Sequence, residues 1–268
     1  MNKRSADGEK ETDGQNAKKR RLTVILVCAA VLSTICFAEL AMRVMPHRVD
    51  LSASQRELSS LPEMPGAQGV TWSTLDDYEK RMRRINPDYV GVIRIEGVLD
   101  YPVVRGEDNV KYLSTSYGGD GNAYGAIFMD YRCAGDDVPH IIIYGHNAVD
   151  TDRNSYLFNG LQRFLDEQFM AAHPVITFVK NDAIFEFEVF SARITDISDP
   201  AYQLDFSAPE SFDAFLERNG APPGASQILT LSTCYVGGGD DGRLVVQGAL
   251  RNTLPIDKTQ TMVAEPST

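Results

Sequence analysis

The sequence predicts a mainly β domain, a closed barrel or a sandwich, preceded by a transmembrane anchor. Eight short apolar segments separated by polar turns follow Tyr89, and the segment IFEFEVF at 184–190 alternates as a strand with one wet face does. An uncharged apolar run at 22–38 comes before all of them. The predicted strands are 89–95, 100–104, 126–131, 140–146, 175–180, 184–194, 228–234 and 243–250.

Three helices are predicted around these strands. An amphipathic pattern at 74–85 ends at Asn86-Pro87, since the residue before a proline is driven out of the helical region. Apolar residues also recur at helical spacing in 157–169 and in 209–218. The first helix precedes the strands, and the other two interrupt them.

The apolar run LTVILVCAAVLSTICFA at 22–38 directly follows four basic residues at 18–21. Its length is at the short end for a bilayer span, and the basic cluster indicates a cytoplasmic N-terminus. We therefore expect a single-pass protein of the cell membrane with an extracellular domain. A cleaved signal peptide is the alternative, although the long polar lead and the missing small-x-small site favour an anchor. The expected organisation is a basic tail (1–21), anchor (22–42), stalk (43–72), folded domain (73–253) and flexible tail (254–268).

Charge and cysteine content exclude two classes of function. The 268-residue chain has a formal net charge of -11, and without residues 1–21 it still carries 19 basic against 33 acidic side chains. Such an acidic body repels phosphate backbones, so no nucleic-acid partner is expected. Two of the four cysteines, Cys28 and Cys36, lie in the apolar run, which leaves Cys133 and Cys234 and excludes a disulfide scaffold. The number of cysteines alone does not decide whether Cys133 and Cys234 form a disulfide bond.

A thiol and a cation flank one predicted turn. Cys234 ends the apolar segment ILTLSTC, a Gly-rich stretch follows at 237–242, and Arg243 begins the next strand. Hairpin geometry brings both residues to the same end of the sheet. A nearby cation favours the thiolate, and a guanidinium can stabilise an oxyanion. A buried cysteine beside a surface arginine is the alternative interpretation.

His146 ends another apolar segment, HIIIYGH, just after Gly145, which lets the backbone turn. Histidine is the usual proton donor and acceptor near neutral pH, although a histidine at a strand end is more often structural. The other histidines are scattered and offer no workable zinc array, and no phosphate-binding glycine pattern follows a strand. No metal and no cofactor are expected.

Taken together, YGHN at 144–147, TLSTC at 230–234 and Arg243 nine positions later resemble the sortase family. The stretches DYPVV (100–104), DNVKYL (108–113) and AIFMDYR (126–132) look like its class B branch, and the similarity runs from about Ser73 to Leu250. The resemblance implies an eight-stranded β-barrel and a cysteine transpeptidase. Cys234 would attack a Thr carbonyl to form a thioacyl enzyme, His146 would act as acid and base, and Arg243 would hold the oxyanion.

The same resemblance implies substrates and substrate contacts. The substrates would be secreted surface proteins or pilins with a C-terminal sorting motif of the NPxTx or LPxTG kind, and the acceptor would be an amine of a peptidoglycan precursor or of a pilin. The backbone N–H of the residue after the nucleophile would be an oxyanion donor, and Cys133 would be a bystander. The implied substrate-binding residues are Asn109, Leu113, Tyr144, Ser232 and Tyr235.

Two other functions stay open on the residues alone. One is an extracellular cysteine protease of another type, although papain-like and caspase-like signatures are missing around Cys234. The other is an anchored β-rich binding module without catalysis, for which Cys234 would be dispensable.

Overall fold

The computed structural model divides the chain into two compact units, Met1–Val49 and Asp50–Thr268. The structure describes residues 59–63, 72–135, 137–147, 157–180, 183–208, 211–235, 237, 239 and 241–256, all in the second unit. The predicted anchor at 22–42 and basic tail lie outside the described residues, as does most of the stalk. Within the described part, no helix has the length and apolarity needed to cross a membrane.

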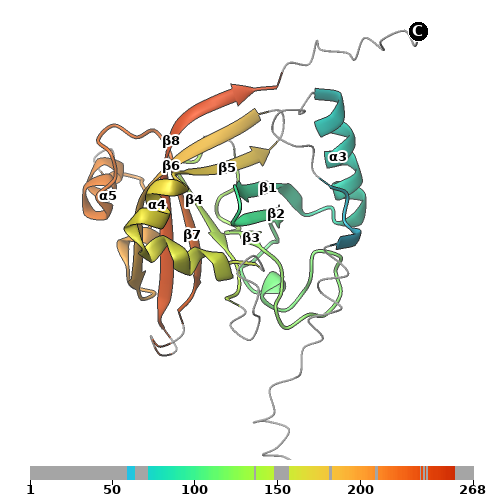
Figure 1. The fold of residues 1–268 in the computed structure, drawn as a ribbon, viewed down its shortest axis with the longest axis horizontal. Coiled ribbons are helices and arrows are strands. Elements are labelled where there is room, and N and C mark those ends of the chain that lie inside the picture. Colours follow the sequence, from blue (N-terminus) through green and yellow to red (C-terminus); the bar gives the residue numbers. More distant parts are fainter. Residues whose placement is uncertain are drawn as a thin grey trace, which may run out of the picture. The chain divides into compact units, whose positions relative to one another are not determined.

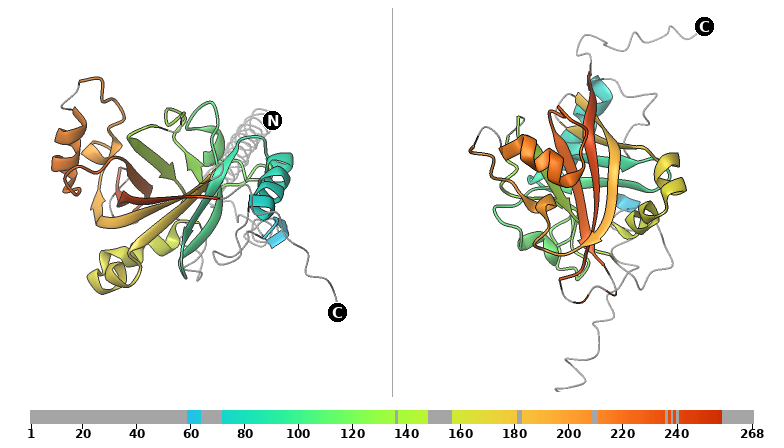
Figure 2. Two further views of the ribbon diagram at one scale, coloured as in Figure 1. Left: turned by 90° about the horizontal axis from the view of Figure 1, so that it is seen from above. Right: turned by 90° about the vertical axis from the view of Figure 1, so that its left-hand side faces the viewer.

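Eight strands close into a barrel in the order β1-β2-β3-β4-β7-β8-β6-β5 (Figures 1 and 2). The closed barrel is therefore confirmed, and the sandwich is excluded. The strands are β1 Tyr89–Ile95, β2 Leu99–Val104, β3 Phe128–Met129, β4 His140–Tyr144, β5 Val175–Lys180, β6 Ala183–Thr195, β7 Ile228–Cys234 and β8 Arg243–Pro255.

Two long excursions interrupt the barrel, as predicted. The 3₁₀ helix η2 (Asn159–Leu165) and helix α4 (Glu167–Ala172) lie between β4 and β5, while η3 (Pro200–Tyr202) and α5 (Ser211–Asn219) lie between β6 and β7. A further 3₁₀ turn, η1 (Lys111–Leu113), lies between β2 and β3. Figure 1 shows α4 and α5 on the outside of the sheet.

Helix α3 (Trp72–Ile85) precedes the barrel and begins two residues earlier than predicted. Leu75, Tyr78 and Met82 recur at helical spacing and are fully or almost fully buried against barrel residues. Each such burial contributes about 1.5–3 kcal/mol to folding. The helix ends as expected, because Asn86 donates its N–H to the Met82 carbonyl and Pro87 follows.

The period-two alternation of strands decides which side chains enter the barrel. On β7, Leu229 and Leu231 belong to the interior cluster, whereas Thr230 and Ser232 belong to the opposite face. On β8, Leu244 and Val246 point inward. The outer face of β7 and β8 is covered by the excursion between β6 and β7, whose residues form a separate apolar cluster with Ile228 and Ala249.

Several predicted boundaries were wrong, among them the end of the strand predicted at 140–146, which stops at Tyr144. Three of the differences have clear local reasons. The segment 157–169 is not one helix, because the Asp166 side chain accepts the N–H groups of Gln168 and Phe169 and starts a new helix. Strand β3 is only two residues long, since Asp130 begins a turn closed by the Cys133 N–H. Strand β8 continues past 250 to Pro255, because it stays paired with β6 to that point.

A buried polar network lies outside the barrel interior. The His140 side chain is 1% exposed; its Nδ1 donates to the Gln203 carbonyl at 2.7 Å, and its Nε2 accepts from Thr230 Oγ1 at 2.8 Å. Gln247 Nε2 donates to the same hydroxyl at 3.1 Å. Burial lowers the pKa of His140 to about 4, because the charged imidazolium would lose its hydration. His140 is therefore a neutral structural residue.

We predict that acid weakens the fold through His140. Its folded pKa lies below the ordinary value of 6.5, so the unfolded chain takes up a proton first as the pH falls. The stabilisation is complete above about pH 6.5 and is lost toward pH 4. Between pH 7.5 and pH 5, urea unfolding should show a loss of about 2 kcal/mol that His140→Gln largely removes. Thr230→Val leaves the imidazole buried, so this variant should lose as much unfolding free energy between the two pH values as the wild type. The same loss in His140→Gln contradicts the prediction.

Candidate functional site

Cys234 and Arg243 are direct cross-strand partners at the loop end of the β7–β8 hairpin. Side chains in such a pair stand about 5 Å apart on the same face of the sheet. The Tyr235 N–H donates to the Gly242 carbonyl at 3.0 Å and closes the loop above them, and Arg243 Nη1 donates to that carbonyl at 2.9 Å. The Cys234 thiol is exposed and free, and Cys133 is also free, so the bridge that counting left open is absent.

A parallel pairing brings His146 to the same place. Strand β4 runs alongside β7 with Tyr144 opposite Ser232, so the residue two positions after Tyr144 comes level with Cys234. The contact continues beyond the strand, because the Gly145 N–H donates to the Ser232 carbonyl at 3.2 Å and Asn147 Nδ2 donates to the Cys234 carbonyl at 3.1 Å. Both neighbours of His146 are thus fastened to β7.

Gly145 is needed for space rather than for backbone freedom. A Cβ at this position would lie 2.9 Å from the ring of Phe158, a fully buried residue that begins the excursion after β4. The Phe158 N–H also donates to the His146 carbonyl at 3.2 Å. The sequence-based reason given for Gly145, a free turn of the backbone, was therefore wrong.

The His146 ring is held in one tautomer. Its Nε2 lies 2.9 Å from the Leu113 carbonyl oxygen, which can only accept, so Nε2 carries the hydrogen. This bond fixes the ring plane and leaves Nδ1 to exchange a proton with a reacting group. Leu113 thus contributes a backbone acceptor as well as its half-exposed side chain.

A pocket of about 390 Å³ surrounds these three groups on the outer face of the barrel. The ends of β4, β7 and β8 form its floor, the loop between β2 and β3 forms one wall, and the segment after β6 forms another. Seven of the eight residues named from the sequence line it: Asn109, Leu113, Tyr144, His146, Ser232, Cys234 and Arg243.

The eighth residue, Tyr235, lies apart from the other seven. Its half-buried ring packs against the barrel's interior cluster and is not among the residues that line the pocket. Successive strand residues point to opposite faces, so the residue after Cys234 turns away from the thiol. Its N–H, expected as an oxyanion donor, is occupied by Gly242.

Asp130 is a functional residue that sequence reasoning missed. It is 0% exposed and accepts hydrogen bonds from Asn109 Nδ2 at 2.8 Å and from the Tyr144 hydroxyl at 3.0 Å, while Arg132 pairs with it at 2.8 Å. Burial alone would raise the pKa of this carboxyl, but the Arg132 bonds and those from Asn109 and Tyr144 outweigh it and hold the pKa below its ordinary value. Its anionic form orients both pocket residues. A carboxylate inside the apolar stretch 126–131 was the available signal.

Ile197 and Tyr202 line the opposite wall and were also missed. The Tyr202 hydroxyl and Ser232 Oγ are 2.8 Å apart, so this wall is bonded to the strand that carries the nucleophile. Burial raises the pKa of Tyr202, which remains a neutral phenol. Nothing local in the sequence ties these residues to Cys234, because the link runs across the fold.

Cys133 is 1% exposed, and burial raises the pKa of its thiol to about 11. A thiol in that state is not nucleophilic at neutral pH. In the part of the chain that the structure describes, no group of three or more His, Cys, Asp or Glu side chains could hold a metal ion.

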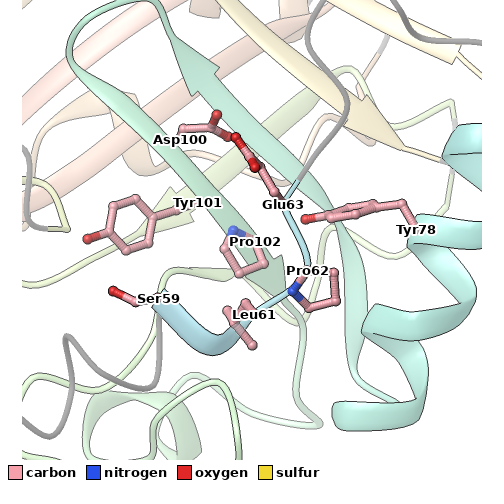
Figure 3. Close-up of a pocket in the computed structure, with 8 residues that line it drawn as sticks. All are labelled: Ser59, Leu61, Pro62, Glu63, Tyr78, Asp100, Tyr101 and Pro102. Atoms are coloured by element: carbon pink, nitrogen blue, oxygen red, sulfur yellow. The ribbon is translucent and has the colours of Figure 1, made fainter.

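A second pocket, of about 420 Å³, lies where residues 59–63 pass α3 and β2 (Figure 3). Among the described residues that line it, Glu63 and Asp100 carry carboxylates, and Asp100 is already bonded to Arg94 at 2.7 Å. None of these described residues has a thiol or an imidazole. The chemistry described above therefore belongs to the first pocket.

A family model described as the sortase domain matches residues 92–251, which span both walls and the floor of that pocket. The chain belongs to the sortase family. Sortases are cysteine transpeptidases, so the thiol, imidazole and guanidinium of the first pocket have the expected chemistry.

Similarity to named relatives points to the class B sortases. Sortase B of Listeria monocytogenes is 30% identical over 186 residues, which cover 65% of this chain and 74% of the relative. Sortase B of Staphylococcus aureus is 30% identical over 164 residues, which cover 57% of this chain and 66% of the relative, just under two thirds.

Solved structures agree. A mutant form of Clostridium perfringens sortase B matches with a TM-score of 0.61 and 29% identity, covering 67% of this chain and 89% of that one. A Staphylococcus aureus sortase B–substrate complex matches with a TM-score of 0.58 and 25% identity, covering 77% of this chain and 93% of that one. The class B resemblance and the sortase-type barrel are confirmed.

We predict that Gly145→Ala destabilises the sortase domain by about 1–3 kcal/mol, because the new methyl group overlaps the buried Phe158 ring. Thermal unfolding measures the loss, and Gly121→Ala, where a Cβ meets no atom within 4 Å, is the matched control. A second substitution, Phe158→Leu, should recover part of the stability. Equal stability of Gly145→Ala and Gly121→Ala contradicts the assigned contact.

We also predict that iodoacetamide at pH 8 modifies Cys234 at least about a hundredfold faster than Cys133 in the folded full chain, since only the former is exposed. Peptide mass spectrometry after timed quenching measures both rates. In urea the modification rates of the two cysteines should become similar. Similar rates in the folded protein would remove the distinction between nucleophile and bystander.

Proposed function

We propose that this sortase cleaves a C-terminal sorting signal after Thr and releases the fragment that follows. It then transfers the Thr acyl group, held on Cys234, to an amine of a cell-wall precursor or of a pilin. The observation that carries the proposal is the double registry on β7, where Arg243 on one side and the segment Gly145–Asn147 on the other meet at Cys234. The three groups line one pocket on the outer face of the barrel, where an extended peptide can enter from solvent.

In the first half-reaction, His146 takes the thiol proton of Cys234 at Nδ1, and the resulting Sγ thiolate attacks the Thr carbonyl carbon and forms a tetrahedral intermediate. The Arg243 guanidinium, on the adjacent strand, stabilises the oxyanion that develops. Collapse breaks the C–N bond, and His146 donates a proton to the leaving amine, which leaves a thioacyl enzyme. The amide N–H of Tyr235 takes no part, since it is bonded to Gly242.

In the second half-reaction, the acceptor amine attacks the thioacyl carbon and loses a proton to His146. The Cys234 sulfur leaves as the thiolate, so the enzyme returns to its starting state. The Leu113 carbonyl keeps the imidazole in place during both transfers by holding Nε2–H. Proton exchange then takes place at Nδ1.

The proposed location is the outer face of the cell membrane. The uncharged run at 22–38 behind four basic residues at 18–21 supports an anchor with a cytoplasmic N-terminus. Protease added to intact cells should remove the domain containing Cys234 while leaving residues 1–21 protected. Protection of the whole chain contradicts this orientation.

A hydrolase is the second candidate, because water can attack the same thioacyl group and Cys234 is exposed. Peptides of the NPxTx and LPxTG kinds, incubated with and without an added amine such as triglycine, separate the two outcomes. A sortase gives an amine-linked product whose yield rises with amine concentration. Free carboxylate as the sole product at every amine concentration supports the hydrolase.

We predict that Cys234→Ala abolishes turnover of the preferred peptide, and that His146→Ala and Arg243→Ala each lower kcat/KM by about 10²–10⁴-fold with the fold intact. The losses follow from removing the nucleophile, the proton carrier and the oxyanion partner. Progress curves measure turnover, and circular dichroism measures the fold.

Arg251→Ala is the matched control for Arg243→Ala. Arg251 lies on the same strand and pairs with Glu186 at 3.4 Å on the surface, so its loss should leave turnover near wild type. Full activity of Arg243→Ala excludes the guanidinium from the mechanism. Full activity of His146→Ala assigns proton transfer to another group, and full activity of Cys234→Ala excludes this thiol as the nucleophile. Absence of turnover in the wild type as well as in Cys234→Ala supports the non-enzymatic binding module.

A further inference from the structure

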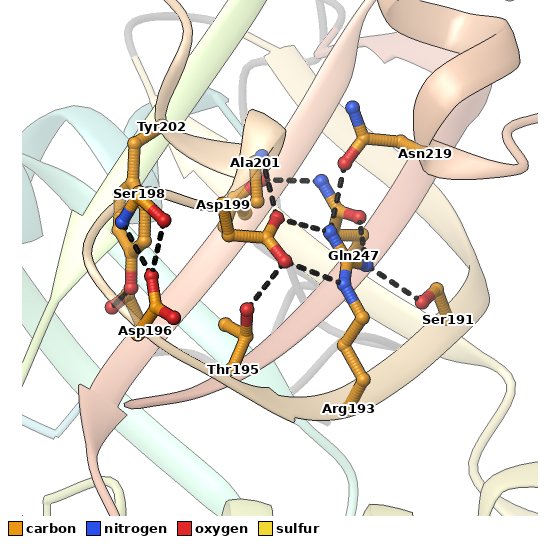
Figure 4. Close-up of polar contacts among 12 residues, drawn as sticks. Ser191, Arg193, Thr195, Asp196, Ser198, Asp199, Ala201, Tyr202, Asn219 and Gln247 are labelled. Atoms are coloured by element: carbon orange, nitrogen blue, oxygen red, sulfur yellow. Dashed lines mark hydrogen bonds and ion pairs between the residues drawn. The ribbon is translucent and has the colours of Figure 1, made fainter. Parts of the chain in front are cut away.

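One wall of the pocket rests on an ion pair that takes no part in the chemistry. Asp199 lies in the turn after β6, and its side chain is 10% exposed. Its carboxylate accepts from Arg193 Nη2 at 2.6 Å and Nε at 3.1 Å, and from the Thr195 hydroxyl at 2.5 Å. It also accepts from the Ala201 N–H at 2.7 Å, which caps η3 (Figure 4).

Arg193 is held as firmly on its other side. Nη1 donates to Gln247 Oε1 at 2.7 Å and to Ser191 Oγ at 3.0 Å, and Nη2 also donates to Asn219 Oδ1 at 2.9 Å (Figure 4). A guanidinium has five N–H groups, and each has a partner here. Through Gln247 the pair is joined to Thr230 on β7 and to the buried His140 network.

The segment fixed by this pair supplies the pocket wall. Ile197 lies two residues before Asp199 and Tyr202 three residues after it, and both line the pocket. Ile197 is 58% exposed, so packing contributes little to its position. Its backbone is shaped locally, because Asp196 accepts from the Ser198 N–H at 2.7 Å and hydroxyl at 2.6 Å. Asp199 attaches the beginning of this segment to the barrel, while the Tyr202–Ser232 and His140–Gln203 hydrogen bonds attach its later residues.

We propose that Arg193 and Asp199 are positioning residues that hold the wall of Ile197 and Tyr202 in its binding geometry before the sorting peptide arrives. The inference rests on the proposed function of the pocket. The site then has two parts. The floor carries out the chemistry and is positioned by strand pairing, whereas the wall binds the peptide and is positioned by this ion pair. Loss of the ion pair should therefore weaken binding more than it slows the chemical step.

The test compares Asp199→Asn with Glu186→Gln in the full chain, with the NPxTx or LPxTG peptide that the wild type turns over fastest. Glu186 and Arg251 also form an ion pair between β6 and β8, but at the other end of the strands, about 30 Å from the loop. Asp199→Asn should raise KM about tenfold and change kcat by less than about twofold, while Glu186→Gln leaves both near wild type. Arg193→Lys, which keeps a charge but not the planar fork, should give a smaller rise in KM.

KM separates positioning from general stability, because a variant that only lowers the folded fraction reduces kcat and leaves KM unchanged. Hydrogen exchange of residues 196–203 should quicken in Asp199→Asn and not in Glu186→Gln. If Asp199→Asn does not fold, Arg193→Lys and Thr195→Val, which removes one bond to the same carboxylate, take its place.

The outcomes separate the inference from the function on which it rests. Turnover by the wild type with unchanged KM in the Asp199 and Arg193 variants overturns the inference alone. A fall in kcat at constant KM also overturns it. Failure of the wild type to turn over any peptide, with the amine present or absent, rejects the proposed function itself.

Discussion

The active arrangement depends on the pairing of β7 with its two neighbours. The antiparallel register with β8 puts Arg243 opposite Cys234, and the parallel register with β4 brings His146 level with the same residue. A shift of either register by one residue would turn one of these side chains to the other face of the sheet. The apolar residues of these strands prevent such a shift, since Leu229, Leu231, Leu244 and Val246 would all leave the interior.

The alternation that builds the core also builds the site. Most inward positions on β4, β7 and β8 are aliphatic, whereas the outward positions include four buried polar residues: His140, Thr230, Ser232 and Gln247. Nearer the β7–β8 loop, the outward positions of these strands are occupied by Tyr144, Cys234 and Arg243. Polar side chains on this face thus form a buried structural network at one end and the exposed chemical site at the other.

Local features of the site could be predicted from the sequence, and features that depend on distant pairing could not. The proximity of Cys234 and Arg243 could be predicted, because the two residues are nine positions apart and flank a single glycine-rich turn. His146 was placed beside them only by family resemblance, since nothing local specifies a parallel β4–β7 register. The inward direction of the Tyr235 ring follows from strand alternation. Asp130 and Tyr202 act through residues 14 to 30 positions away, beyond the reach of any spacing rule.

The fold also explains why the chemical groups and the binding wall can differ in rigidity. The β8 ladder on one side and the Asn147 side chain on the other constrain the main chain of Cys234, so little side-chain packing is needed to keep the thiol in place while it stays exposed. The segment after β6 has no neighbouring strand, and polar side chains supply the restraint that a ladder would otherwise give. An ion pair with four accepted hydrogen bonds on its carboxylate is directional where apolar packing is not. The wall is therefore held in one geometry while Ile197 remains exposed to meet a peptide.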